Sequence, residues 1–237
     1  VTGVQTCALP ISEWVDELPA PPIQDHARKR QHLHFHTLDE QRTLLSFALG
    51  LMEQAGVAKP QAFRAGSFAC NRDTFRALRE NGIAIDSSLN ACTDISGADL
   101  RPLDVHEKPS WIEGVYSVPV AVYDDGFGKP RSAQVNGSSF RELQEALESA
   151  SQHGCTDFVI VSHNFEMLKP GSSEPDPWVV KRFESLCRYL ADNRRDYEVD
   201  TFKLPDASAH GATATKRPHV GRVATIGRYA EQLRRRF

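Results

Sequence analysis

The chain has 237 residues, of which 40% are hydrophobic, 25% charged and 8% aromatic. These fractions, with a mean hydropathy of -0.43, are ordinary for a globular protein and exclude collagen-like and disordered classes. No run approaches the ~18 uncharged apolar residues of a membrane helix, and a formal net charge of -3 gives no general attraction to nucleic acid or to an anionic membrane. We therefore expect no nucleic-acid partner and no membrane span.

The first residues differ in character from the rest of the chain. Residues 1–11, VTGVQTCALPI, resemble the translation of a common sequencing-library adaptor and lack the basic and apolar regions of a signal peptide. We expect them to lie outside the fold and the natural chain to begin upstream. Setting Cys7 aside leaves four of the five cysteines, widely spaced and without a CxxC pair. This spacing favours a reducing compartment, and we expect a cytoplasmic protein.

Local patterns predict amphipathic helices that alternate with short strands. Capping residues mark where helices begin, and β-branched or alternating runs mark strands. The predicted elements are a loop over 12–31, a helix from Thr37 to Gly56, a strand over 61–66, a helix from Asn71 or Asp73 to Asn81, strands over 83–87 and 115–123, a helix from Ser139 to Gly154, a strand over 157–162, a helix from Asp176, a strand over 197–202 and a helix from about Gly221. This alternation predicts an α/β fold with a parallel sheet or barrel and chemistry at the carboxyl ends of the strands.

The last two predicted helices each have an apolar stripe, which we expect to face inward. The basic residues of the final helix are expected to form a solvent-exposed face rather than a nucleic-acid arm. The residues expected inward are Val179, Val180, Phe183, Leu186, Cys187 and Leu190, then Val223, Ile226, Ala230 and Leu233; those expected outward are Arg222, Arg228 and residues 234–236.

Polar residues at predicted strand ends are the first candidates for a site. His163 directly follows an apolar run that we expect to be a buried strand, so its ring should line the active face. Arg64 also ends a predicted strand, and a buried arginine is costly unless it pairs with a carboxylate. Asp86 could pair with Arg64 or cap the following turn. We interpret residues 124–126 as a turn rather than a site.

Three histidines alternate just before the first predicted helix. An extended backbone would place His32, His34 and His36 on one face, where imidazoles can share a metal ion. The alternative is a polar loop leading into a capped helix. We favour the loop, because no carboxylate has a matching spacing; His34 and His36 stay as alternative metal ligands.

Several motifs resemble those of one enzyme family. Residues 62–68 (AFRAGSF), 71–78 (NRDTFRAL), Gly82–Ile83 and 86–88 (DSS), with 162–165 (SHNF), are similar to the polysaccharide deacetylases. These have a NodB homology domain and form carbohydrate esterase family four, and the likeness is greatest to a branch linked to lipopolysaccharide biosynthesis. It spans about residues 12–204.

The resemblance implies a distorted (β/α) barrel that removes N- or O-acetyl groups from a glycan with a divalent metal, usually zinc. An Asp and two His hold the metal in this family, and a second Asp is the general base. By position, Arg64 would pair with that base and His163 would protonate the leaving group. Trp111 and Asp86 are candidate substrate-binding residues, and the partner would be a carbohydrate or surface glycan.

One departure from the family pattern affects the site. In this branch a His-x-His segment precedes a pair similar to Glu13–Trp14, and the aspartate motif lies further upstream, where residues 1–11 now stand. We therefore expect an N-terminally truncated, inactive fragment with a partial barrel over 12–204 and a C-terminal loop and basic helix over 205–237. Zinc is expected in the intact parent only. The alternative is a degenerate, non-catalytic barrel that binds a glycan or a protein partner.

Overall fold

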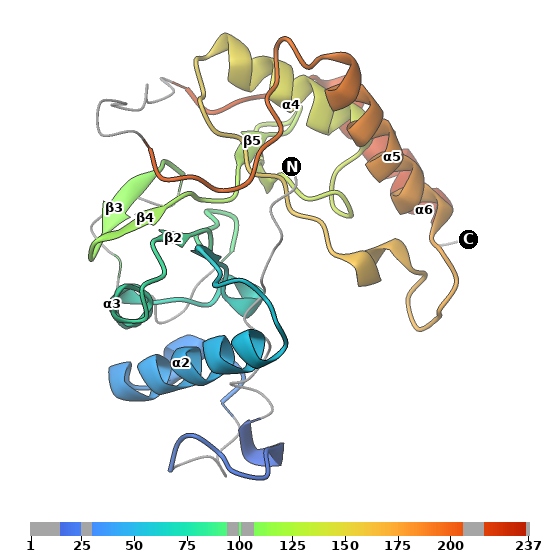
Figure 1. Cartoon of the computed structure of the whole chain (residues 1–237). Helices are drawn as coiled ribbons and strands as arrows, with labels where there is room; N and C mark the ends of the chain where they lie inside the picture. Colours follow the sequence, from blue (N-terminus) through green and yellow to red (C-terminus); the bar gives the residue numbers. More distant parts are fainter. Residues whose placement is uncertain (1–14, 25–29, 94–99, 101–106, 206–215, 236–237) are drawn as a thin grey trace. The chain divides into compact units, whose positions relative to one another are not determined.

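The computed structural model describes residues 15–24, 30–93, 100, 107–205 and 216–235. The chain divides into two compact units. Within the described residues, the first comprises 15–119 and 201–205, and the second comprises 120–200 and 216–235. Each unit has its own hydrophobic core, and Figure 1 labels helices and strands of both units.

Two helices that begin at capping boxes cover the first unit. α2 (Leu38–Gln54) has Thr37 as its N-cap, and α3 (Arg72–Glu80) has Asn71, each in a reciprocal pair of side-chain and backbone hydrogen bonds. Both predicted helices are confirmed, and each helix packs along the other. Their inward side chains enter a core around Phe63. The 3-10 turns of this unit are η1 (Val15–Glu17), η2 (Leu33–Phe35) and η3 (Gly66–Phe68).

A small, largely parallel sheet packs against these helices. Its order is β1 (Ala62–Phe63), β2 (Ile85–Asp86), β4 (Val115–Ser117), β3 (Ser110–Ile112), with β1, β2 and β4 parallel and β3 antiparallel at the edge. The sequence predicts parallel strands that end near Arg64, Asp86 and His163. The first two, β1 and β2, are parallel as predicted, whereas no strand element directly precedes His163 in the described residues. Since Phe63 is in register with Asp86, the residues that follow both strands emerge at the same edge of the sheet.

The second unit is built from three helices and a hairpin. α4 (Phe140–Gln152) begins at the capping box of Ser139 and Glu142, and α5 (Pro177–Asp192) begins at Asp176, as predicted. The hairpin pairs β5 (Val122–Asp124) with β6 (Pro130–Ser132). The remaining elements are η4 (Asn164–Met167) and α6 (Arg222–Arg234).

The strands predicted over 61–66 and 83–87 are present but are only two residues long, as β1 and β2, and three other predicted strands differ more from the structure. The run 115–123 divides into β4 and β5, because Pro119 lies between them and cannot donate a backbone hydrogen bond. Residues 157–162 make scattered backbone hydrogen bonds and one isolated bridge, between Gln134 and Val161, instead of a continuous strand. Residues 197–202 form no strand, and residues 198–201 are exposed.

The helix faces expected inward are partly wrong. On α5, Phe183 and Cys187 are exposed, whereas Arg182 is buried and pairs with Glu231. On α6 the expected face is exposed throughout, and the buried residues are Ala224, Thr225 and Arg228. Buried ion pairs, described below, set the rotation of α6.

The fold is therefore mixed α/β, with two small sheets and no closed barrel in the part of the chain that the structure describes. None of the helices in these residues combines the length and the apolar character needed to cross a bilayer.

Candidate functional site

Arg64 and Asp86 lie at adjacent strand ends and are linked through two serines. Arg64 donates from Nε to the carbonyl oxygen of Ser87 (2.9 Å) and from Nη2 to the Ser87 hydroxyl (2.8 Å). Asp86 accepts from the Ser88 backbone N–H (2.9 Å) and the Ser88 hydroxyl (2.6 Å). The Ser88 hydroxyl also accepts from the Ala65 N–H (2.8 Å), which joins the two strand ends. The sequence predicts that Asp86 either pairs with Arg64 or caps the following turn, and the structure shows that it caps the turn through Ser88.

Burial dominates the electrostatics of this strand-end cluster. Asp86 is 0% exposed, and loss of hydration raises its pKa to about 6, although hydrogen bonds from Ser88 and the charge of Arg64 act in the opposite direction. Burial, with a smaller contribution from Asp86, also raises the pKa of the Cys70 thiol well above its usual value. The cluster thus holds a carboxyl group that can be neutral in mildly acidic solution.

The turn that follows Arg64 has an uncommon backbone. Ser67 and Phe68 have φ angles of 53° and 59°, a region that non-glycine residues seldom occupy. The sequence motif indicated a turn through Gly66, but not that the two residues after it would take left-handed conformations.

His163 begins η4 in the second unit, beside a carboxylate. Its Nδ1 lies 3.1 Å from Glu166 Oε2, within ion-pair distance although not aligned as a hydrogen bond. Glu166 also accepts from the His163 backbone N–H (3.3 Å) and, at Oε1, from Asn136 Nδ2 (2.6 Å). The His163 side chain is 28% exposed and stacks on Phe165. The spacing of three residues between His163 and Glu166 was a readable signal that sequence analysis missed; nothing in the sequence indicated Asn136.

Trp111 forms an exposed aromatic pair on the first unit's sheet. It faces Tyr116 across the antiparallel strands β3 and β4, with ring centroids 5.3 Å apart. Trp111 is 59% exposed. A flat aromatic face of this kind can stack on the apolar face of a sugar ring.

The three alternating histidines do not share one extended face. His34 lies in η2, with its ring stacked on that of His32. His36 is buried; its Nε2 is 3.4 Å from the Arg30 carbonyl oxygen, and its Nδ1 is 3.7 Å from Glu40. Among the described residues no three His, Cys, Asp or Glu side chains come together to hold a metal ion.

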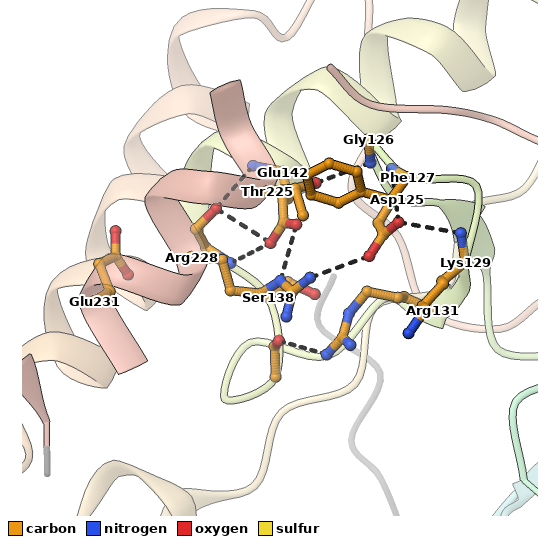
Figure 2. Close-up of polar contacts among 12 residues, drawn as sticks. Asp125, Gly126, Phe127, Lys129, Arg131, Ser138, Glu142, Thr225, Arg228 and Glu231 are labelled. Carbon is orange, nitrogen blue, oxygen red and sulfur yellow. Dashed lines mark hydrogen bonds and ion pairs between the residues drawn. The ribbon is translucent and has the colours of Figure 1, made fainter. Parts of the chain in front are cut away.

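A second cluster, which sequence analysis missed, is a buried ion network around Arg228 (Figure 2). Arg228 on α6 donates from Nε to Glu142 (2.9 Å) and from Nη2 to Asp125 (3.2 Å). The expected turn is present, but it spans residues 125–128, because Asp124 is the last residue of β5. Asp125 also accepts from the Phe127 and Lys129 N–H groups. The expectation that Arg228 faces solvent is wrong, because two carboxylates compensate its charge inside the unit.

Gly126 brings the turn against the start of α6. Its N–H donates to the Thr225 hydroxyl (2.9 Å). A Cβ at this position would lie 2.4 Å from the Arg222 Cα, closer than real Cβ atoms approach. Only glycine therefore allows α6 to sit this close to the turn.

Comparison of the chain with models of protein families, with curated proteins and with solved structures finds no match. The resemblance to polysaccharide deacetylases thus rests on the sequence motifs alone. Of the candidate residues, the structure brings Arg64 and Asp86 together and places Trp111 in the same sheet. His163 belongs to the second unit, with Glu166 and Asn136 as its neighbours.

Proposed function

We propose that the chain is part of a hydrolase that removes N- or O-acetyl groups from a glycan, with the distorted (β/α) barrel of the polysaccharide deacetylase type. The observation that best supports this is the pairing of His163 with Glu166, which has the arrangement expected of a general acid. A reducing, cytoplasmic setting is part of the same proposal, because the four cysteines outside residues 1–11 are widely spaced and include no CxxC pair.

His163 is assigned the proton transfer to the leaving group. Glu166 Oε2 lies 3.1 Å from Nδ1 and also accepts from the His163 backbone N–H, so the carboxylate fixes the position of the ring at the start of η4. Asn136 holds the other carboxylate oxygen of Glu166 and fixes its orientation. His163 then donates its Nε2 proton to the departing amine or alkoxide.

Arg64 and Asp86 are assigned positioning roles. Asp86 is fully buried, so it acts through Ser88 on the turn rather than by touching substrate. Arg64 holds the backbone and hydroxyl of Ser87 at the same edge of the sheet. Together they fix the conformation of the strand-end turns, where barrel enzymes carry their catalytic loops.

The resemblance also implies a zinc ion, and the described histidines do not fit one. The His36 ring is buried against Arg30 and Glu40. The His34 ring stacks on His32 and contacts Phe35 edge-on. A zinc site needs three or four ligands whose lone pairs converge. We therefore assign no metal ligand among the described residues and derive no step through a metal.

Acetate release from N-acetylglucosamine oligomers tests the proposal. The release is measured with and without zinc for two proteins. One is the chain as given, and the other is an extended protein that includes the residues encoded upstream in the same reading frame. We expect zinc-stimulated release from the extended protein and none from the chain as it stands. In the extended protein, His163→Ala should lower kcat by ~10²-fold or more with little change in KM, because the proton is needed only as the bond breaks.

The matched control is His153→Ala, which removes a histidine of the same unit that contacts Ser149 and His219; its kcat should stay near that of the unsubstituted protein. Absence of acetate release from the extended protein, or full activity in its His163→Ala variant, would contradict the proposal. Zinc-stimulated release from the unextended chain that is lost in His34→Ala or His36→Ala would transfer the site to those residues.

A second candidate function is glycan binding without catalysis. It is favoured by Trp111, whose exposed ring pairs with Tyr116 at the edge strand. Titration of the chain with N-acetylglucosamine oligomers should then change the tryptophan fluorescence, and Trp111→Ala should abolish the change. Binding that depends on Trp111, together with no acetate release from either protein, would select this function over the first.

A further inference from the structure

On the amphipathic helix α6 the apolar face is exposed to solvent, and the opposite face is buried. The side chains of Val223, Ile226 and Leu233 are 64%, 57% and 58% exposed, and Ala230 is exposed as well. The opposite face, with Ala224, Thr225 and Arg228, is the one that enters the unit. Hydrophobic side chains that could be buried by a rotation of the helix are thus held in solvent.

Ion pairs on the buried side prevent that rotation. Arg228 meets Glu142 and Asp125, as Figure 2 shows for its guanidinium group. Further along α6, Glu231 pairs with Arg182 (2.7 Å), and Arg235 pairs with Asp176 (2.8 Å). Turning the apolar face inward would bring the charges of α6 into solvent and leave Asp125, Glu142 and Asp176 without their counter-charges, which is strongly unfavourable for buried carboxylates. The exposed face is therefore a fixed feature of the unit.

The spacing of the exposed residues is that of a helix-pairing seam. Val223, Ile226, Ala230 and Leu233 follow one another at intervals of three, four and three residues. These are the a and d positions of a heptad, a stripe narrower than that of a helix lying on a bilayer. Small residues, Gly227 and Ala230, lie at or beside the stripe and permit close approach of a second helix.

Charge indicates what kind of helix fits. Arg222 and Arg234 flank the stripe on its two sides, both are exposed, and neither has an ion pair in the described part of the chain. A second copy of α6 would add two more arginines and no carboxylate at flanking positions. A partner helix with Asp or Glu at its e and g positions would pair with both arginines.

We propose that the seam of Val223, Ile226, Ala230 and Leu233 docks an amphipathic helix of a partner protein that has aliphatic residues along one stripe and carboxylates beside it. The surface is preformed, because the ion pairs hold α6 in place before binding. The interaction is independent of acetyl hydrolysis.

A designed peptide probe tests this directly. The probe has about three heptads with Leu at a and d and Glu at e and g, and its matched control has Lys at e and g. We expect the Glu peptide to bind the chain, measured by calorimetry, and the Lys peptide not to bind. Ile226→Glu should weaken binding of the Glu peptide at least ~10-fold, and Arg234→Glu should weaken it and reduce its salt dependence.

The control variant is Val57→Glu, which changes an exposed valine that is 48% exposed in the first unit; its binding should equal that of the unsubstituted chain. Ile226 is exposed, so its variant should keep the same circular dichroism and unfolding midpoint. Failure of the Glu peptide to bind, equal binding of both peptides, or unchanged binding by Ile226→Glu would overturn the proposal. Dimerisation in sedimentation experiments, or binding to vesicles with anionic lipid, that is lost in Ile226→Glu would assign the seam to a second copy or to a membrane instead.

Discussion

Arg228 Nε donates a 2.9 Å hydrogen bond to Glu142 Oε1, and the two side chains are 2% and 0% exposed. Glu142 is the same carboxylate that completes the capping box of α4, where its other oxygen accepts from the Ser139 N–H. One side chain therefore both begins a helix and fixes a second helix to it. The pairing makes the stability of the second unit depend on a cation at position 228.

Removing that cation should be severely destabilising. We expect Arg228→Met to lower the free energy of unfolding by ~3–5 kcal/mol, because Asp125 and Glu142 would stay buried without a counter-charge. Urea unfolding followed by circular dichroism measures the change. The matched substitution Arg141→Met removes an exposed pair with Glu145 and should change stability by less than ~1 kcal/mol. A loss for Arg228→Met as small as that of Arg141→Met would contradict the prediction.

Asp86 should make stability fall between about pH 4 and pH 6. Its pKa in the fold is about 6, against an ordinary value of 3.8 for an aspartate in the unfolded chain. Between these two values the native state retains a proton that the unfolded state has lost. Stability therefore falls as pH rises, by about 3 kcal/mol from this group, and is constant above the window. Urea unfolding at a series of pH values should show this fall, and Asp86→Asn should lack it. Asp73→Asn, at a half-buried position in the first turn of α3, controls for the loss of a carboxylate and should keep the fall in stability.

Glu40 should act in the opposite pH direction. Hydrogen bonds from Arg30 are the main cause that lowers the pKa of Glu40 from 4.5 to about 2. Below pH 4.5 the unfolded chain takes up a proton first, so the stabilisation is present at neutral pH and is lost as pH falls toward 2. Glu40→Gln should therefore be less stable than the unsubstituted chain at pH 7 and equally stable near pH 2. A difference that does not change with pH would be inconsistent with this pairing.

The cysteines should differ widely in reactivity. The thiolate is the reactive form, and burial both raises the pKa of Cys70 and removes it from solvent, whereas Cys187 is exposed. With a thiol reagent at pH 8, peptide mass spectrometry should find Cys187 modified long before Cys70, and equal rates only in denaturant. Modification of native Cys70 at the rate of Cys187 would show that the strand-end cluster opens readily.

Helix boundaries could be predicted from the sequence because their causes are local. Thr37 with Glu40, and Ser139 with Glu142, cap their helices through residues three apart, so the pattern alone indicates the structure. The parallel pairing before Arg64 and Asp86 followed from the alternation of strands and helices.

The rotation of α6 could not be predicted in this way. Its apolar stripe is the face that periodicity assigns to the core, but Arg228 is drawn inward by Asp125 and Glu142, which lie far away in the sequence. Local patterns contain no information about such long-range pairs. The same holds for residues 157–162, whose apolar run predicts a strand although its neighbours supply only isolated hydrogen bonds.

The candidate site was predictable only in part. The position of His163 after an apolar run pointed to it, and Glu166 lies within one turn of it. Asn136, which orients Glu166, comes from a separate segment. Trp111 was singled out as a substrate contact, and only the pairing of β3 with β4 shows that its ring faces Tyr116.

The separation along the chain between Arg228 and its two carboxylates bears on how the protein is made. Asp125 and Glu142 precede Arg228 by 103 and 86 residues, so on the ribosome both are synthesised well before their counter-charge. Until α6 emerges, the nascent second unit would have to leave those carboxylates hydrated and its core open. We therefore expect this unit to fold only after α6 has been translated. Until then its apolar side chains stay accessible, and a chaperone could bind them.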